Sequence, residues 1–202
     1  MSRAAYIAFE GSEASGKSTQ AKRLADALGA VHTRETGGTP IGARLREILH
    51  DVTVTDLDPR AEALITAADR AQHLATVVEP ALAAGQHVVS DRTVYSTLAY
   101  QGYGRGVALD DLRRINDWAV RGRWPDVVFL LTVSPETTAR RMGKRELDRF
   151  ERAGDEFHTR VDQGFREMAA GDPDRWVLVD ADQPIDDVST LIRDTVRERF
   201  GV

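Results

Sequence analysis

Five short apolar runs recur along the chain, and most are followed by stretches whose apolar residues have helical spacing. The runs cover residues 5–9, 31–35, 87–91, 127–131 and 176–180, and the fourth is continuous and apolar, as an interior parallel strand requires. The first helical stretch follows the first run and ends near residue 28. The others cover residues 40–49, 59–78, 93–102, 109–120, 135–142, 156–170 and 185–200. This alternation predicts an α/β three-layer sandwich, a five-stranded parallel sheet with helices on both faces.

The spacing of apolar positions also predicts which helix faces are buried. In the second helix the expected buried face is Ile41, Leu45, Ile48 and Leu49. In the long helix that Asp58-Pro59 opens, the expected stripe is Leu64, Ala67, Ala68, Ala71, Leu74 and Val78, with a kink or an early end at Pro80. Thr66, Arg70 and His73 line up away from that stripe, which predicts His73 at the surface or an interface.

Length and composition restrict the class of protein. The 202 residues, 42% apolar and 29% charged, suit one globular domain spanning 1–202. No apolar run is long enough to cross a membrane and no signal peptide opens the chain, which predicts a cytoplasmic protein without membrane contact. The chain has no cysteine and a formal charge of −5, so we expect no disulfide and no nucleic-acid partner. Any phosphate site must therefore be a local concentration of positive charge.

A glycine-rich motif stands between the first strand and the first helix. Residues 11–18 read Gly-Ser-Glu-Ala-Ser-Gly-Lys-Ser and fit G-x-x-x-x-G-K-[ST], the pattern of a P-loop. Its backbone N–H groups are expected to face the phosphates of ATP, which assigns to nucleotide binding Gly11, Ser12, Glu13, Ala14, Ser15, Gly16, Lys17, Ser18 and Thr19. Lys17 is expected to reach the β- and γ-phosphates and Ser18 to ligate Mg²⁺. The alternative, a flexible glycine turn, is disfavoured because strand, loop and helix follow in the required order.

Polar residues follow several predicted strands where those strands end. Ligands bind beyond the carboxyl ends of parallel strands, and Arg34-Glu35 and Asp91-Arg92 both stand there. Asp91 has the context of a carboxylate that holds Mg²⁺ through water, and Arg92 beside it suits a second, phosphate-bearing substrate. The alternative for Asp91-Arg92 is a simple ion pair at a strand end.

Residues 140–152 are densely charged. Arg141, Arg145, Arg149 and Arg152 would share one face of a helix, and Gly143 could serve as a hinge. We interpret residues 141–153 as a lid that brings positive charge to the transferring phosphoryl group as it closes. The alternative is a solvated face with i,i+4 ion pairs.

Two predicted helices could frame a pocket for a nucleobase. The long helix supplies Thr66 and Arg70, and the helix after Arg92 supplies Ser96, Thr97, Tyr100 and Gln101. Such side chains can stack on a base and bond to its edge. The remaining histidines, His32, His50, His87 and His158, form no metal-binding pattern.

Together these blocks resemble the thymidylate kinase family, whose members pass the ATP γ-phosphate to dTMP. The resemblance runs over nearly the whole chain, through residues 9–19, 34–39, 68–73, 91–102 and 148–151. It implies that Glu13 lies near the acceptor sugar and phosphate, that Arg34, Glu35 and Arg92 surround that phosphate, and that Arg70 faces the thymine edge. Ala14 in the P-loop, together with the arginines of the lid, resembles the bacterial arrangement. The resemblance also implies a homodimer.

Three positions depart from the family pattern. Thr36 replaces the usual proline, Thr93 replaces an aromatic residue, and Thr66 stands where a phenylalanine stacks on thymine. Losing such a stack costs about 1–3 kcal/mol of base binding.

The function these residues predict is direct, in-line transfer from Mg-ATP to a nucleoside monophosphate, foremost dTMP. The catalytic groups are then Lys17, Arg92, Glu13, Arg141, Arg145 and Arg149. The alternatives are a kinase for another or several pyrimidine monophosphates and a non-catalytic nucleotide-binding homologue. A nucleotide-dependent switch would need an N-K-x-D motif to read guanine, and Asn116-Asp117 does not supply one.

Overall fold

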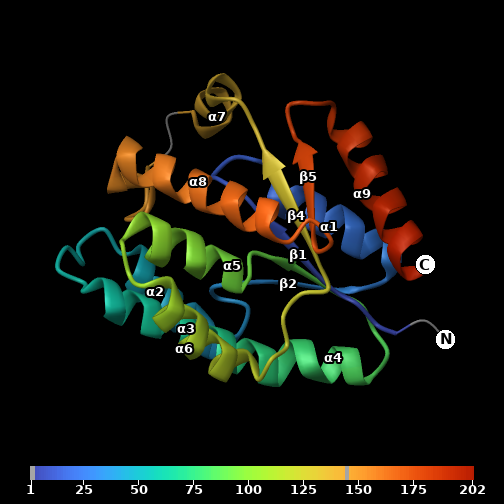
Figure 1. Cartoon of the computed structure of the whole chain (residues 1–202), viewed down its shortest axis with the longest axis horizontal. Coiled ribbons are helices and arrows are strands. Elements are labelled where there is room, and N and C mark those ends of the chain that lie inside the picture. The colour runs from blue at the N-terminus through green and yellow to red at the C-terminus, as the bar shows by residue number, and fades with distance from the viewer. Residues whose placement is uncertain (1–2, 144–145) are drawn as a thin grey trace.

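The computed structural model describes residues 3–143 and 146–202, and at its centre lies a parallel sheet (Figure 1). Its strands are β1 (Tyr6–Glu10), β2 (Val31–Arg34), β3 (Val88–Asp91), β4 (Val127–Thr132) and β5 (Trp176–Asp180). They are ordered β2-β3-β1-β4-β5, and every neighbouring pair is parallel. The predicted five-stranded α/β fold is confirmed.

The helices connect these strands. They are α1 (Lys17–Leu28), α2 (Pro40–His50), α3 (Pro59–His73), α4 (Glu79–Ala83), α5 (Val94–Thr97), α6 (Leu109–Val120), α7 (Pro135–Met142), α8 (Asp155–Gly171) and α9 (Ile185–Phe200). A π-helical turn, Leu74–Val78, joins α3 to α4, and a second one, Leu98–Gly104, extends α5. Pro80 therefore follows a widened turn within a continuing helical run and does not end it.

Alternate residues of the central strands face opposite layers. Ile7, Phe9 and Phe129 pack with α1 and α9, whereas Ala8, Val128 and Leu130 pack with a layer that includes α5 and α8. Figure 1 shows α9 on one side of the sheet and α8 on the other. The two-residue period of a strand thus gives each helical layer its own core.

The predicted apolar faces of α2 and α3 are wrong in part. Ile41, Ile48 and Leu64 are exposed, at 54%, 44% and 55%, while Leu49 is buried. The buried face of α3 is instead largely polar, and His73, expected at the surface, is fully buried. Burial of these polar groups is tolerated because most of them bond to groups on other elements, a compensation that hydrophobic periodicity does not register.

The arginine-rich segment is not one helix. α7 ends at Met142, Gly143 follows with φ +60°, and residues 146–150 are not helical. Asp148 accepts hydrogen bonds from the backbone N–H groups of Phe150 and Glu151, a local turn that competes with a helix. Arg141, Arg149 and Arg152 therefore do not share a helical face, and Arg145 lies outside the described residues.

Candidate active site

The P-loop places Lys17 at the start of α1, beneath the backbone of residues 11–16. Gly11 has φ +137°, and a side chain there would begin 2.3 Å from the carbonyl oxygen of Leu131. Lys17 is 6% exposed, and its Nζ donates to the carbonyl of Ser12 at 2.5 Å and to Ser15 Oγ at 3.2 Å. Burial and the nearby Arg92 lower the pKa of Lys17 to about 8. The ammonium group is thus poorly compensated and suited to an anionic ligand.

Ser18 and Asp91 form a pair of oxygen ligands beside Lys17. Ser18 Oγ donates to Asp91 Oδ2, while Asp91 Oδ1 is buried without a hydrogen-bond partner among the described residues. A hydroxyl and a carboxylate oxygen lacking a partner fit the oxygen preference of Mg²⁺. Across the described ranges no group of three or more His, Cys, Asp or Glu side chains could hold a metal ion, so Ser18 and Asp91 would supply only part of the ligand set of a cation here.

Arg92 turns away from Asp91, so the simple strand-end ion pair is not formed. Its backbone has φ +68°, and its guanidinium pairs with Glu13 and donates to Tyr100 Oη at 3.0 Å and Ser96 Oγ at 3.1 Å. Burial disfavours the charged form of Glu13, but Arg92 and Lys17 outweigh it and lower the pKa of Glu13 to about 2. Glu13 therefore stays ionised and fixes the position of Arg92.

Glu10, at the end of β1, holds the residues that position Arg92. The carboxylate is completely buried and accepts hydrogen bonds from Thr93 N and Thr93 Oγ1, both at 2.8 Å, and from Ser96 Oγ at 2.6 Å. It thereby joins the end of β1 to the turn that follows Arg92. Sequence reasoning gave Glu10 no role of its own, because one carboxylate in an apolar strand carries no motif.

Glu35 anchors a second buried network. Its Oε2 accepts from Arg70 Nε at 2.8 Å, and its Oε1 lies 2.8 Å from His73 Nδ1. The other ring nitrogen of His73 lies 2.6 Å from Thr33 Oγ1, so the imidazole links β2 to the loop that carries Glu35. Burial alone would raise the pKa of Glu35, but Arg70 and His73 outweigh it and lower the pKa.

Glu35→Gln is expected to reduce the free energy of unfolding by about 3 kcal/mol at pH 7, because it leaves Arg70 buried without its counter-ion. The lowered pKa of Glu35 means that this stabilisation is complete above the ordinary value of 4.5 and is lost as pH falls through the folded-state value. Urea unfolding at pH 7 and pH 4 should thus show a smaller difference from wild type at pH 4. Glu198→Gln, on the exposed side of α9, is the control. An equal difference at both pH values would contradict the prediction.

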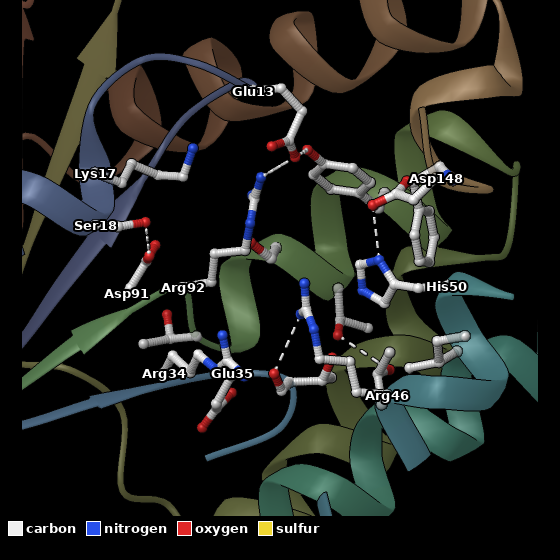
Figure 2. Close-up of a pocket in the computed structure, with 18 of the residues that line it drawn as sticks. Glu13, Lys17, Ser18, Arg34, Glu35, Arg46, His50, Asp91, Arg92 and Asp148 are labelled. Atoms are coloured by element: carbon white, nitrogen blue, oxygen red, sulfur yellow. Dashed lines mark hydrogen bonds and ion pairs between the residues drawn. The ribbon is translucent and has the colours of Figure 1, made fainter. Parts of the chain in front are cut away.

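One cavity of about 420 Å³ joins these groups (Figure 2). The predicted site residues that line it are Glu13, Ala14, Gly16, Lys17, Ser18, Thr19, Arg34, Glu35, Thr66, Arg70, Asp91, Arg92, Ser96, Thr97, Tyr100, Gln101 and Arg141. Arg149 does not line it, nor do Gly11, Ser12 and Ser15, which shape the P-loop behind it.

Several other residues that line the cavity were not predicted as site residues from the sequence. These are Thr36, Arg46, Leu49, His50, Asp148 and Phe150. Arg46 is the most informative, because burial and then the like charges of Arg34 and Arg92 lower its pKa. Arg34, Arg46 and Arg92 thus place like charges close together in one cavity, which suits a bound anion. Only the presence of Asp148 and Phe150 in a motif of the resembled family could have drawn attention to them.

The part of the cavity between α3 and α5 is lined by amide, hydroxyl and guanidinium groups. Arg70 Nη2 donates to Thr97 Oγ1 at 3.1 Å, and Thr97 Oγ1 donates to Thr66 Oγ1 at 3.2 Å. Thr66 in turn donates to the carbonyl of Ala63 at 2.8 Å. The rings of Tyr100 and Phe150 also line this cavity and meet edge to face, with centroids 5.8 Å apart.

The segment around Arg149 contacts α2 and α3. His50 Nδ1 donates to Asp148 Oδ2 at 2.7 Å, as Figure 2 shows. Arg149 donates to Glu62 Oε2 at 2.6 Å and to the carbonyl of Leu49 at 2.8 Å. At the other end of the proposed lid, Arg141 donates to the carbonyls of Ala14 at 3.1 Å and Ala181 at 2.9 Å.

The fold and this site define a class. A P-loop opening α1, a hydroxyl–carboxylate pair beside it and a second cationic region in the same cavity are the parts of a P-loop nucleotide kinase.

Comparison with known proteins gives the family. The model of the thymidylate kinase family matches residues 9–192. The chain is 43% identical to the thymidylate kinase of Oleidesulfovibrio alaskensis over 210 residues, covering 98% of this chain and 99% of that protein. It is 41% identical to the thymidylate kinase of Bifidobacterium longum strain NCC 2705 over 201 residues, covering 96% and 97%. This chain therefore belongs to the thymidylate kinase family, and the predicted family is confirmed.

Proposed function

We propose that this chain transfers the γ-phosphoryl group of ATP to dTMP, giving dTDP for dTTP synthesis. The observation that carries the proposal is one cavity that runs from Lys17 to Arg34 on β2, Arg46 on α2 and Arg92, which directly follows β3. A donor on the P-loop and an acceptor phosphate near Arg34, Arg46 and Arg92 would share that cavity. Because both substrates would then be held side by side, the phosphoryl transfer becomes a reaction within one complex and no longer depends on a collision between free molecules.

The residues act by position and charge. Lys17 and the P-loop amides hold the donor phosphates. The Arg92 guanidinium donates hydrogen bonds to the acceptor phosphate and stabilises the negative charge of the phosphoryl group during transfer. Glu13 holds Arg92 in place through their ion pair. The acceptor phosphate is already an anion near neutral pH, so no general base is needed.

Ser18 and Asp91 are the residues that would hold Mg²⁺, with the nucleotide phosphates completing the ligand set. The unpartnered Asp91 Oδ1 supports this assignment. When bound, Mg²⁺ neutralises charge on the transferring phosphates.

Residues 141–153 form a lid in the bacterial manner, within one kinase domain spanning 1–202. The P-loop carries Ala14 where an arginine would otherwise supply charge. Arg141 already reaches the P-loop, whereas Arg149 reaches α3. The lid therefore contacts the P-loop on the donor side and α3 on the acceptor side.

The acceptor nucleotide lies across α3 and α5. Ser96 holds Arg92 at the phosphate end and Glu35 holds Arg70, while Arg70, Thr97 and Gln101 meet the base. Thr66 favours a second candidate function, a kinase that accepts several pyrimidine monophosphates, because α3 presents no ring to stack on the base. Tyr100 and Phe150, whose rings line the cavity, can compensate.

Coupled release of ADP from Mg-ATP tests the proposal, with dTMP, dUMP, UMP, CMP, AMP and GMP as acceptors and a reaction without acceptor as control. A strong preference for dTMP supports it. Similar rates with several pyrimidine monophosphates would favour the second candidate. ATP binding without acceptor-dependent turnover would instead indicate a non-catalytic homologue.

Thr66→Phe is expected to lower the KM for dTMP about fivefold or more, because a base–aromatic stack contributes about 1–3 kcal/mol. Steady-state kinetics at saturating Mg-ATP measure the change. Thr66→Ser keeps the hydroxyl without adding a ring and serves as the control. An unchanged KM in a folded Thr66→Phe variant would mean that the base does not lie against this face of α3.

We also propose a homodimer through α2 and α3, which contact each other and carry the exposed Ile41, Ile48 and Leu64. A dimer would remove these apolar side chains from water. A mass of twice that of the chain by light scattering is the expected result. Over residues 3–143 and 146–202, no helix is long and apolar enough to cross a membrane, and the cytoplasmic location stays a prediction.

A further inference from the structure

Glu62 is a charged residue that sequence reasoning passed over. It lies on α3 with no exposed surface, and three side chains donate to it. Gln101 Nε2 donates to Glu62 Oε1 at 2.7 Å, and Arg149 Nη2 donates to Oε2 at 2.6 Å. Arg105 Nε is 3.4 Å from Oε1. One buried carboxylate thus joins the π-helical extension of α5 to the proposed lid.

The carboxylate dictates which way the Gln101 amide points. An ionised carboxylate only accepts hydrogen bonds, so the NH₂ end of Gln101 must face Glu62 and the carbonyl end must face elsewhere. Gln101 is 2% exposed and lines the cavity, and its Oε1 accepts no hydrogen bond from any residue that the structure describes. Gln101 therefore presents a hydrogen-bond acceptor, its Oε1, to the cavity and not a donor.

An acceptor at this position distinguishes pyrimidines. Thymine and uracil carry a hydrogen on N3 and can donate to Gln101 Oε1, whereas N3 of cytosine is itself an acceptor. A cytosine here would place two acceptors against each other, and a buried polar group without a partner costs about 1–3 kcal/mol. Selection against cytosine would then depend on the orientation of one amide.

We propose that Glu62 is a positioning residue that sets this orientation and ties it to the lid. One oxygen holds the Gln101 amide with its carbonyl toward the base, and the other holds Arg149, so base selection and lid docking share a single carboxylate. The proposal rests on the base site of the proposed function.

The contacts around Arg149 support the link to the lid. Its guanidinium lies over the ring of Phe150, 4.8 Å from the centroid, and Phe150 packs edge to face on Tyr100. Arg149 also donates to the carbonyl of Leu49, the buried residue near the end of α2. Loss of the Glu62 carboxylate would release Arg149 from α3 and leave Gln101 able to rotate.

Glu62→Gln tests the proposal, because the neutral amide has the same shape but can donate as well as accept. We expect the ratio of kcat/KM for dTMP to kcat/KM for dCMP to fall at least about tenfold, as Gln101 becomes able to present its NH₂ end to cytosine. Glu62→Asp, which keeps the charge but withdraws it from Gln101, should lower the ratio too. Glu47→Gln, which removes a charge from the exposed side of α2, is the matched control and should leave the ratio unchanged.

A double-mutant cycle tests the shared carboxylate. The effects of Glu62→Gln and Arg149→Ala on the KM for dTMP should be less than additive, because both break the same contact. Additive effects would contradict the proposed link between Glu62 and the lid.

A merely structural role for Glu62 predicts a different pattern. It would lower kcat/KM for dTMP and dCMP in the same proportion, and an unchanged ratio in either folded variant would overturn the proposal. If neither variant folds, Gln101→Met, which removes the amide while keeping its length, must lower the ratio in its place. Failure of the proposed function is distinct, because the wild-type chain would then not phosphorylate dTMP at all.

Discussion

Lys17→Ala is expected to lower kcat with dTMP about a thousandfold while the protein remains folded. Removing one preorganised donor from a developing charge costs about 10²–10³ in kcat, and Lys17 is both buried and directed into the P-loop. Coupled release of ADP measures the loss, and circular dichroism checks the fold.

The pKa of Lys17 supplies a second readout. Because burial and Arg92 lower this pKa to about 8, the ammonium loses its proton as pH rises through that value, and wild-type affinity for ATP should weaken there. Lys17→Ala should abolish this dependence. Lys22→Ala, at an exposed ion pair on α1, is the control. Near-normal kcat in Lys17→Ala would contradict the P-loop mechanism.

Arg92→Lys is expected to lower kcat about a hundredfold although it preserves the charge. The guanidinium reaches Glu13, Tyr100 and Ser96 at once, and a lysine ammonium cannot span these positions. Neither residue is glycine, so both meet the same backbone strain at φ +68°, and the comparison isolates the side chain.

Steady-state kinetics over dTMP concentration separate binding from transfer for this variant. Loss of an interaction made only in the transition state lowers kcat and kcat/KM together. A higher KM with unchanged kcat would mean that Arg92 only binds the acceptor. Arg23→Lys, at the exposed ion pair with Asp186, controls for the substitution itself.

Local patterns predicted the framework because their causes are local. The predicted bounds of α6, α7 and α9 agree with the structure, since an amphipathic period bounded by glycine or proline needs no distant partner. The P-loop is equally local, because its glycines and lysine lie within eight residues of sequence. The family followed from several such blocks in their proper order.

The faces of α3 show where local patterns fail. Hydrophobic spacing placed Leu64 inside and His73 outside, and the structure has the reverse. A buried polar face is stable only when partners from other elements satisfy it, and those partners lie far away in sequence. Glu35 and His73, for example, are separated by 38 residues.

The sequence by itself determined the order of strands and helices, the P-loop, the family and most of the residues around the cavity. Tertiary structure decided which charges meet: Arg92 pairs with Glu13 across 79 residues, and Arg149 pairs with Glu62 across 87. It also added Arg46 and His50 to the cavity. The physical reason is that periodicity records which side of an element avoids water, whereas the pairing of charges depends on distances between elements that exist only after the sheet has assembled.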